Sequence, residues 1–562
     1  MRKKMTPVLM VIVLIVLVII AGVMTTVIKK YIPSNNEMDS AEYFGAPGEN
    51  EVAVIVNNQI TPAKGKLIDG NVYLKDETVS QYINSRFYWD AAEKKMIYTL
   101  PEEIIEFQID SKEYITAKGK EEEDYEIVKS VDEDFYLALD FIEQYTDMQY
   151  TAYEDPSRIV VLTPERNRQQ TVVEKSGEIR LKGGIKSDIL KKVEANEELF
   201  VLEELEDWSK VASADGYAGY IQKTKISQPE AVEWVSQKEM PEYTSIQEDY
   251  KINLAWHQVT SQEGNGALQE MIGAATGLNT ISPTWFSLVG EEGEITSLAS
   301  KEYVDQAHAA GLEVWGLVDN FNPDMKTYNV LSFTSKRAKV IEKLVQEAKA
   351  VGLDGINVDF ESITEETGPH YVQFLRELSI ACRKEKLVLS VDNPVPQPYN
   401  MHYDLKEQGI VVDYVIIMGY DEHYNGDSQA GSVASIGFVR SGIEEALLAV
   451  PKEKLISGIP FYTRVWAEPY GSSNVTSEVL GMNGASNYVK EHNMEVVWDE
   501  SVGQNVAELQ ADDALYRIWM EDEQSIEEKM KLVQEYELGG VAEWKLGFER
   551  DSIWEIIEKY LQ

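Results

Sequence analysis

The chain has 562 residues and a formal net charge of −44, with an apolar fraction typical of folded proteins. This length exceeds what one hydrophobic core serves, so we expect several domains, and the charge argues against a nucleic-acid partner because phosphates would be repelled. A single cysteine, Cys382, excludes an internal disulfide. Six histidines without an HExxH or CxxC pattern indicate no metal site. We therefore expect no cofactor and no obligatory protein partner.

The N-terminus predicts a membrane anchor. An uncharged apolar run extends from Met5 to Ile28 behind Arg2, Lys3 and Lys4. A helix over this run would reach about 36 Å and span the ~30 Å hydrocarbon layer of a bilayer. The basic residues favour a cytoplasmic N-terminus, so residues 1–30 predict a single-pass anchor of the cell membrane, with the rest of the chain extracellular. The alternative is a signal peptide, whose cleavage would release a secreted protein.

An internal repeat follows a polar linker over residues 31–50. Residues 72–101 match residues 135–164, and each copy predicts a short helix, a strand, a charged turn and a second strand. The repeat lies within residues 51–165, which resemble the copper amine oxidase N-terminal-like domain of bacterial surface proteins. The resemblance implies an α+β stalk domain, and no cluster of metal ligands accompanies it.

Residues 170–227 predict a small β-barrel, because short strands alternate with turns such as Gly183-Gly184. The segments WSKV, DG and GYI resemble bacterial Src-homology-3-like domains. Trp208 and Tyr220 would then pack in the core, or would face a groove that binds cell-wall peptide or glycan.

Residues 245–562 predict a (β/α)₈ TIM barrel, so the fold class is α/β. Short apolar strands alternate with helical segments, which is typical of this fold. An open doubly wound sheet is the alternative, but the GxGxxG fingerprint is missing after the first strand. The eight predicted strands lie in KINLAWHQVT, NTISPTWFSLVG, LEVWGLVDNF, LDGINVDFES, LVLSVDNPVP, VDYVIIMGYDEH, KLISGIPFYTRVW and LGGVAEWKLGF. Polar or aromatic residues end several of them, where barrel active sites form: Trp285, Asp319, Glu361, Tyr420, Asp421, Trp466 and Trp544.

The fourth strand carries a row of polar residues on one face. If residues 356–361 are a strand, Asn357, Asp359 and Glu361 point into the barrel, because side chains alternate. Glu361 comes last, nearest a substrate, and both the carboxylate below it and partial burial favour its protonated form. A protonated Glu is the general acid that glycoside hydrolysis requires. An ion-pair network and a lectin-like barrel that binds sugar without cleaving it are the alternatives.

The segment DGINVDFE resembles the DxxDxDxE signature of glycoside hydrolase family 18, the chitinase-like family. MGYD on the sixth strand, PFYTRVW on the seventh and Trp544 on the eighth add to the resemblance. It implies substrate-assisted hydrolysis, in which the 2-acetamido oxygen of the sugar attacks. Glu361 would be the acid and base, Asp359 would orient the acetamide, and Tyr420 would hydrogen-bond its carbonyl. The expected substrate-binding residues are Asn357, Trp285, Met418, Asp421, Tyr462 and Trp544.

One position departs from this signature, since Asn357 replaces its middle aspartate. Asn357 can hydrogen-bond Asp359 but cannot hold a proton for it, which puts in doubt a relay through a second aspartate. The DGxNxDFE form resembles spore-germination and wall-lytic enzymes. We therefore expect a glycoside hydrolase that cleaves β-1,4-linked N-acetylglucosamine glycans, either peptidoglycan or chitin, with a glycan-binding surface protein as the alternative.

Overall fold

The computed structural model describes residues 7–164, 167–236, 238–472 and 474–561. The chain divides into two compact units. The first comprises Met1–Trp89 and Glu106–Met240, and the second comprises Asp90–Ile105 and Pro241–Gln562.

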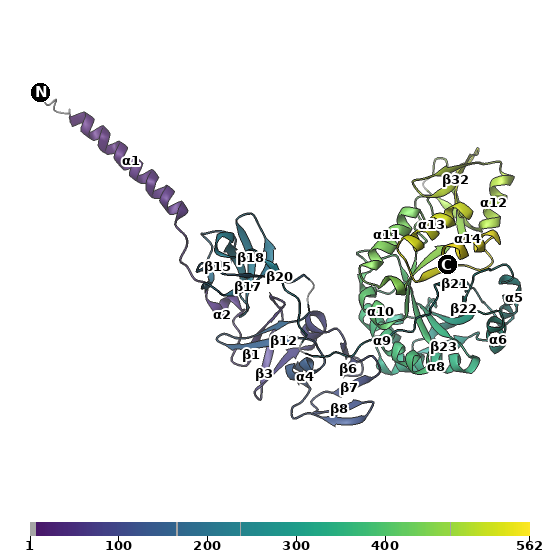
Figure 1. Cartoon of the computed structure of the whole chain (residues 1–562), viewed down its shortest axis with the longest axis horizontal. Helices are drawn as coiled ribbons and strands as arrows, with labels where there is room; N and C mark the ends of the chain where they lie inside the picture. The colour runs from purple at the N-terminus through teal and green to yellow at the C-terminus, as the bar shows by residue number, and fades with distance from the viewer. Residues whose placement is uncertain (1–6, 165–166, 237, 473, 562) are drawn as a thin grey trace. The chain divides into compact units, whose positions relative to one another are not determined.

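The N-terminal helix α1 runs over Pro7–Tyr31 and is drawn in purple in Figure 1. Part of the predicted anchor, residues 1–6, lies outside the described residues. In the part of the chain that is described, no helix is both long and apolar enough to cross a bilayer. The anchor therefore stays a prediction.

The stalk sheet of the first unit has the strand order β10-β11-β4-β3-β1-β13-β12, with β2 paired to β1. Each copy of the repeat begins with a strand that was not predicted. The predicted helix, strand, turn and second strand come after it, so the predicted order of elements is confirmed. The first copy contains β4 (Asn71–Lys75), α3 (Asp76–Thr78), η1 (Val79–Ile83), β5 (Phe87–Asp90) and β6 (Lys95–Thr99). The second contains β11 (Asp134–Ala138), α4 (Leu139–Gln144), β12 (Gln149–Glu154) and β13 (Ser157–Leu162). The other strands are β1 (Glu51–Val56), β2 (Gln59–Ile60), β3 (Gly65–Ile68) and β10 (Val128–Val131), followed in the same region of the sequence by β7 (Ile104–Gln108), β8 (Glu113–Thr116) and β9 (Gly119–Glu122).

The segment predicted as a small barrel forms an antiparallel sheet with the order β16-β15-β19-β18-β17-β14-β20. Trp208 and Tyr220 are both half-buried on neighbouring strands and lie against Gly183. The likeness to Src-homology-3-like domains stays a prediction. The strands are β14 (Gln169–Val172), β15 (Gly177–Arg180), β16 (Ile189–Val193), β17 (Glu198–Glu204), β18 (Trp208–Ser213), β19 (Ala218–Gln222) and β20 (Glu230–Ala231).

The second unit contains a closed barrel of parallel strands, which confirms the predicted TIM barrel (Figure 1). Within the described residues, each of the eight predicted segments supplies one strand of the barrel, and pairing of β21 with β22 closes the ring. The strands are β21 (Ile252–His257), β22 (Thr280–Gly290), β24 (Glu313–Asp319), β25 (Gly355–Asp359), β26 (Val388–Pro394), β27 (Tyr414–Met418), β28 (Leu455–Pro460) and β34 (Gly540–Trp544). The longer helices around them are α6 (Lys301–Ala309), α8 (Thr334–Val351), α9 (Gly368–Glu385), α11 (Ile436–Leu447), α13 (Glu523–Glu535) and α14 (Ser552–Leu561).

Alternating side chains give the barrel two apolar clusters. Ile356 and Val358 on β25 are fully buried and belong to the outer cluster, which includes Leu344 of α8 and Leu375 of α9. The inner cluster contains Trp315, which stacks on Tyr414 with 5.5 Å between ring centroids. Because the barrel strands are buried on both faces, their sequences are nearly continuous apolar runs.

An antiparallel sheet lies between β28 and β34 in the sequence, and the sequence did not predict it. Its strand order is β30-β29-β33-β32-β31. Trp466, predicted to end a barrel strand, lies within β29 and is 1% exposed, so that prediction is wrong. The elements are β29 (Tyr462–Pro469), β30 (Thr476–Gly481), α12 (Met482–Glu491), β31 (Glu495–Asp499), β32 (Gln504–Gln510) and β33 (Ala514–Met520).

Candidate active site

The predicted acid, Glu361, lies just beyond the carboxyl end of β25. The strand ends at Asp359, two residues earlier than the sequence predicted. Asn320, which follows β24, holds the backbone of Glu361 from both sides. The Glu361 N–H donates to Asn320 Oδ1 (2.9 Å), and Asn320 Nδ2 donates to the Glu361 carbonyl (3.0 Å) and to Thr327 Oγ1 (2.8 Å). The neighbouring strand therefore fixes the position of the acid.

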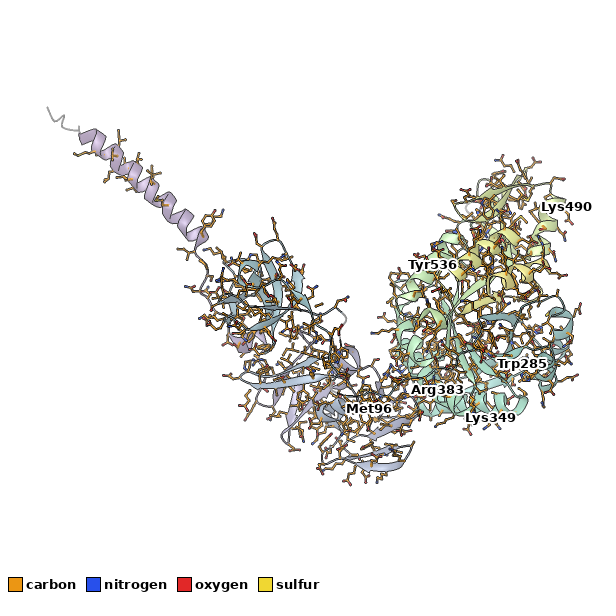
Figure 2. The ribbon with its side chains drawn as sticks, viewed as in Figure 1. Met96, Trp285, Lys349, Arg383, Lys490 and Tyr536 are labelled. Atoms are coloured by element: carbon orange, nitrogen blue, oxygen red, sulfur yellow. The ribbon has the colours of Figure 1, made fainter. Side chains whose placement is uncertain are left out.

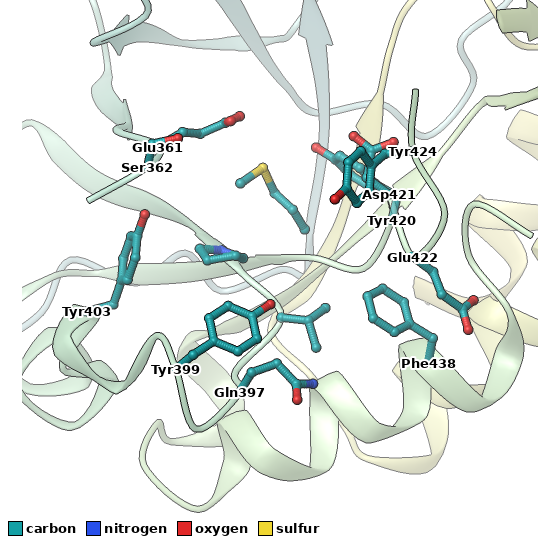
Figure 3. Close-up of a pocket in the computed structure, with 13 residues that line it drawn as sticks. Glu361, Ser362, Gln397, Tyr399, Tyr403, Tyr420, Asp421, Glu422, Tyr424 and Phe438 are labelled. Carbon is teal, nitrogen blue, oxygen red and sulfur yellow. The ribbon is translucent and has the colours of Figure 1, made fainter. Parts of the chain in front are cut away.

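Glu361 opens into a cavity of about 430 Å³ at this end of the barrel. Figure 3 shows Glu361 on one side and Tyr420, Asp421 and Tyr424 on the other. The volume is within the range of small-ligand sites. The lining residues are Glu361, Ser362, Pro394, Val395, Gln397, Tyr399, Tyr403, Met418, Tyr420, Asp421, Glu422, Tyr424 and Phe438.

The surroundings of Glu361 favour its protonated form. The side chain remains open to solvent through the cavity, yet protein atoms surround much of the carboxyl group. Partial burial first, and then the carboxylates of Asp421 and Asp319, raise the pKa of Glu361 above its ordinary value. A carboxylic acid held neutral beside a cavity can donate a proton to a bound substrate.

Asp359 and Tyr420 place an acceptor and a donor near this acid. Asp359 is 5% exposed at the end of β25, below Glu361. Burial, followed by the nearby Asp359 carboxyl, raises the pKa of Tyr420 well above its ordinary value. Tyr420 therefore keeps its proton and can donate a hydrogen bond to an oxygen in the cavity.

Asp421 is held by a second tyrosine. Tyr462 Oη donates to Asp421 Oδ1 at 2.5 Å, and the Tyr462 ring meets that of Tyr420 edge-on. Asp421 has a φ of 58°, in the left-handed region, and it lines the cavity while Tyr462 is 5% exposed. Tyr462 thus supports Asp421 from behind and does not itself line the cavity.

Three residues predicted to bind substrate lie elsewhere. Asn357 is fully buried and its side chain bonds only within the barrel. Trp285 is 1% exposed because its indole N–H donates to Asn265 Oδ1 (2.8 Å) while its ring packs against Tyr303. Figure 2 labels Trp285 on the barrel. The predicted sugar-binding role is therefore wrong for Asn357 and Trp285. Trp544 ends β34, is half-buried against Trp256 and does not line this cavity.

The sequence did not single out several aromatic residues of the cavity. Tyr399 is 79% exposed and Tyr424 is 56% exposed, and both lie in loops that follow barrel strands. Tyr403 accepts a hydrogen bond from the Ile363 N–H through its hydroxyl (3.2 Å). Loop residues have no periodic pattern, but the run NPVPQPYN after the fifth strand marks such a loop by its prolines.

The electrostatics of the site predict a specific pH response. Replacing Asp421 by Asn removes a negative charge that raises the pKa of Glu361. The acid then loses its proton at lower pH, so the alkaline limb of kcat/KM should move to lower pH, since that limb reports the acid of the free enzyme. The measurement is kcat/KM as a function of pH. Asp427→Asn is the control, because Asp427 pairs with His423 and does not line the cavity. An unmoved limb in Asp421→Asn would contradict the coupling.

Comparison with known proteins places this barrel in a family. A model of glycosyl hydrolases family 18 matches residues 298–549, and one of the copper amine oxidase N-terminal domain matches residues 54–161. The uncharacterised glycosylase YvbX of Bacillus subtilis (strain 168) is 25% identical over 297 residues, which are 50% of this chain and 85% of that protein. The cortical fragment-lytic enzyme of the same strain is 28% identical over 233 residues.

The match to the cortical fragment-lytic enzyme covers 40% of this chain and 54% of that enzyme, so the chain spans about half of its length. The crystal structure of the Bacillus cereus spore cortex-lytic enzyme SleL matches with a TM-score of 0.51 and 21% identity, over 59% of this chain and 79% of that one. This structural likeness shows the fold alone. The family models and the catalytic motif lead to one conclusion: residues 298–549 of this barrel form a glycosyl hydrolases family 18 domain, and residues 54–161, which precede it in the sequence, form a copper amine oxidase N-terminal domain.

Proposed function

We propose that the chain hydrolyses β-1,4-linked N-acetylglucosamine glycans, with bacterial peptidoglycan as the substrate and chitin as the second candidate. The observation that supports this proposal best is the opposition of Glu361 and Tyr420 across one cavity, with Asp359 buried below the acid. A neutral acid on one wall can protonate a glycosidic oxygen. A tyrosine hydroxyl on the other can hold the acetamido group of the sugar.

The reaction proposed is substrate-assisted hydrolysis with retention. Glu361 donates its proton to the leaving oxygen as the acetamido oxygen of the cleaved sugar attacks the anomeric carbon. Asp359 accepts the acetamide N–H and faces the positive charge that develops on the cyclic intermediate. Glu361, now ionised, then takes a proton from the water that opens the ring.

The exposed rings at the cavity support a polymeric substrate. Tyr399 and Tyr424 present large apolar faces to solvent, and such faces stack against sugar rings. The name of the cortical fragment-lytic enzyme supports peptidoglycan, which is why we place it before chitin.

Release of reducing ends tests the proposal. Purified protein is incubated with peptidoglycan and with chitin oligomers, and the products are identified by mass spectrometry. We expect saccharides ending in N-acetylglucosamine from peptidoglycan. Binding of either glycan without new reducing ends would instead favour the lectin-like alternative.

We also propose that the catalytic barrel works outside the cell, next to the wall. The support is the uncharged run from Met5 to Ile28 behind Arg2, Lys3 and Lys4. Protease added to intact cells should remove the barrel, while a cytoplasmic marker protein stays intact. A barrel that survives until the cells are lysed would contradict this location.

A further inference from the structure

The amide of Asn357 is fully engaged inside the barrel. Its Oδ1 accepts hydrogen bonds from Trp256 Nε1 (2.9 Å) and Ser282 Oγ (3.0 Å). Its Nδ2 donates to Ser390 Oγ (3.0 Å) and to Asp392 Oδ1 (2.8 Å). An indole N–H can only donate, so Trp256 fixes which way the amide points. Neither amide hydrogen is left for Asp359, contrary to the sequence-based expectation.

Asp392 lies beside Asp359 on the next strand. The parallel pairing of β25 with β26 joins Val358 to Val391. The next residue of each strand is an aspartate, and neighbouring strands are about 4.8 Å apart. Both side chains are buried, with Asp359 5% and Asp392 1% exposed. The fifth strand therefore brings a second carboxyl group to the residue that the proposed mechanism uses.

Each of these carboxyl groups has one buried oxygen without a hydrogen-bond donor among the described residues, namely Asp359 Oδ1 and Asp392 Oδ2. Two ionised carboxylates cannot satisfy each other, because both only accept. With one shared proton, the two carboxyl groups can form an O–H···O⁻ hydrogen bond, which is short and strong. A buried neighbouring pair of this kind is most stable when it holds one proton.

The surroundings reinforce this state. Burial first, then the charge of Asp392 and that of Glu361, raise the pKa of Asp359 well above its ordinary value. Burial raises the pKa of Asp392 to about 8, against the hydrogen bond from Asn357, which lowers it. The other titratable groups that act on the pair are Asp319 of β24, Tyr371 of α9, Tyr403 and Tyr420. None of these groups is a cation.

We propose that Asp392 is a positioning residue that stores a proton for Asp359, and that it replaces the middle aspartate absent at Asn357. The role rests on the proposed substrate-assisted reaction. When the acetamide N–H binds, the shared proton moves from Asp359 to Asp392, which leaves Asp359 as the carboxylate that accepts the N–H. The proton returns when the product leaves, so no proton or electron is gained or lost over the cycle.

Three variants test the role of Asp392. Asp392→Asn keeps an oxygen that Asn357 can bond but removes the proton store. Asn357→Asp adds a third carboxyl group to the cluster. The double variant N357D/D392N exchanges the carboxyl and the amide between two strands that are already in contact. Asp404→Asn is the matched control, since Asp404 caps α10 (Leu405–Val411), does not line the catalytic cavity, and Asn is an equally good cap.

We expect Asp392→Asn to lower kcat about tenfold or more with little change in KM, because Asp359 loses the charge-assisted hydrogen bond that positions it. The acid limb of kcat should move to lower pH, because removal of the Asp392 charge lowers the pKa of Asp359. Asn357→Asp should lose activity as well. The double variant should regain most of the lost kcat, and Asp404→Asn should match the wild type in rate and pH profile.

Infrared difference spectroscopy, as the pH is raised past the pKa of Asp392 of about 8, tests the stored proton without turnover. Every protein compared, the wild type included, also carries Glu361→Gln, so that the acid contributes no carboxylic-acid band of its own. The wild type should lose a buried carboxylic-acid C=O band as the pH rises, Asp392→Asn should lack that band, and N357D/D392N should retain one. If Asp392→Asn does not fold, the wild-type band and the activity of the double variant still test the role of Asp392. A wild type without the band, or an Asp392→Asn enzyme with wild-type kcat and pH profile, would overturn the proposal. Failure of the wild type to cleave any acetylated glycan would instead overturn the proposed function, whatever the spectrum.

Discussion

Replacing Glu361 by Gln should lower kcat by about 10²–10⁴-fold, the usual contribution of a general acid and base. The amide keeps the shape of the side chain and loses the proton that the leaving oxygen needs. The backbone hydrogen bonds to Asn320 do not involve the carboxyl group, so the position of the residue should not change. KM and the thermal unfolding temperature should therefore stay close to those of the wild type.

The control for this variant is Glu365→Gln. Glu365 is exposed, lies four residues further along the same loop and does not line the cavity, so its replacement should leave kcat unchanged. Steady-state kinetics on an acetylated oligomer give both values. A Glu361→Gln enzyme that keeps more than about a tenth of the wild-type kcat would show that another group is the acid.

The alternation of side chains made the central part of this site predictable. Asp359 and Glu361 could be assigned to one end of a barrel strand because the period of two is visible in the sequence. The assignment of Glu361 to the strand itself was wrong, since pairing ends at Asp359 and Asn320 takes over the positioning. Such hydrogen bonds from a side chain to the backbone come from a residue in a neighbouring loop, and no periodic pattern in the sequence indicates them.

Contacts between strands were the part that the sequence could not supply. Asp392 is 33 positions beyond Asp359 in the sequence and becomes its neighbour only through the register of β25 and β26. Trp285 failed as a sugar platform for a related reason. Its place near the end of a strand was predicted, but Asn265 and Tyr303, which cover it, come from elsewhere in the chain.

Cleavage should require an N-acetyl group on the sugar whose bond is broken. A covalent mechanism needs a second carboxylate about 5–5.5 Å from the acid, and an inverting one needs it about 6.5–9.5 Å away. Asp359 is buried at the end of β25, two residues before Glu361 and on the same side of the cavity, and so cannot approach the anomeric carbon from the opposite face. Asp421 lies across the cavity, where its Oδ1 accepts a hydrogen bond from the hydroxyl group of Tyr462. A carboxylate held in this way suits binding of sugar hydroxyls better than attack on carbon.

The acetamido oxygen is then the remaining nucleophile, held by Tyr420 and Asp359. Acetylated and fully deacetylated oligomers of equal length are incubated with the enzyme side by side. The acetylated oligomer should be cleaved and the deacetylated oligomer should not, although the deacetylated oligomer should still compete with the acetylated one for binding in the cavity. The first-formed anomer, followed by NMR, should retain its configuration. A thiazoline copy of the cyclic intermediate should bind more tightly than substrate, because it resembles a state close to the transition state. Cleavage of the deacetylated chain at a comparable rate, or inversion of the anomer, would return Asp421 or another carboxylate to the role of nucleophile or base, since Asp421 faces Glu361 across the cavity.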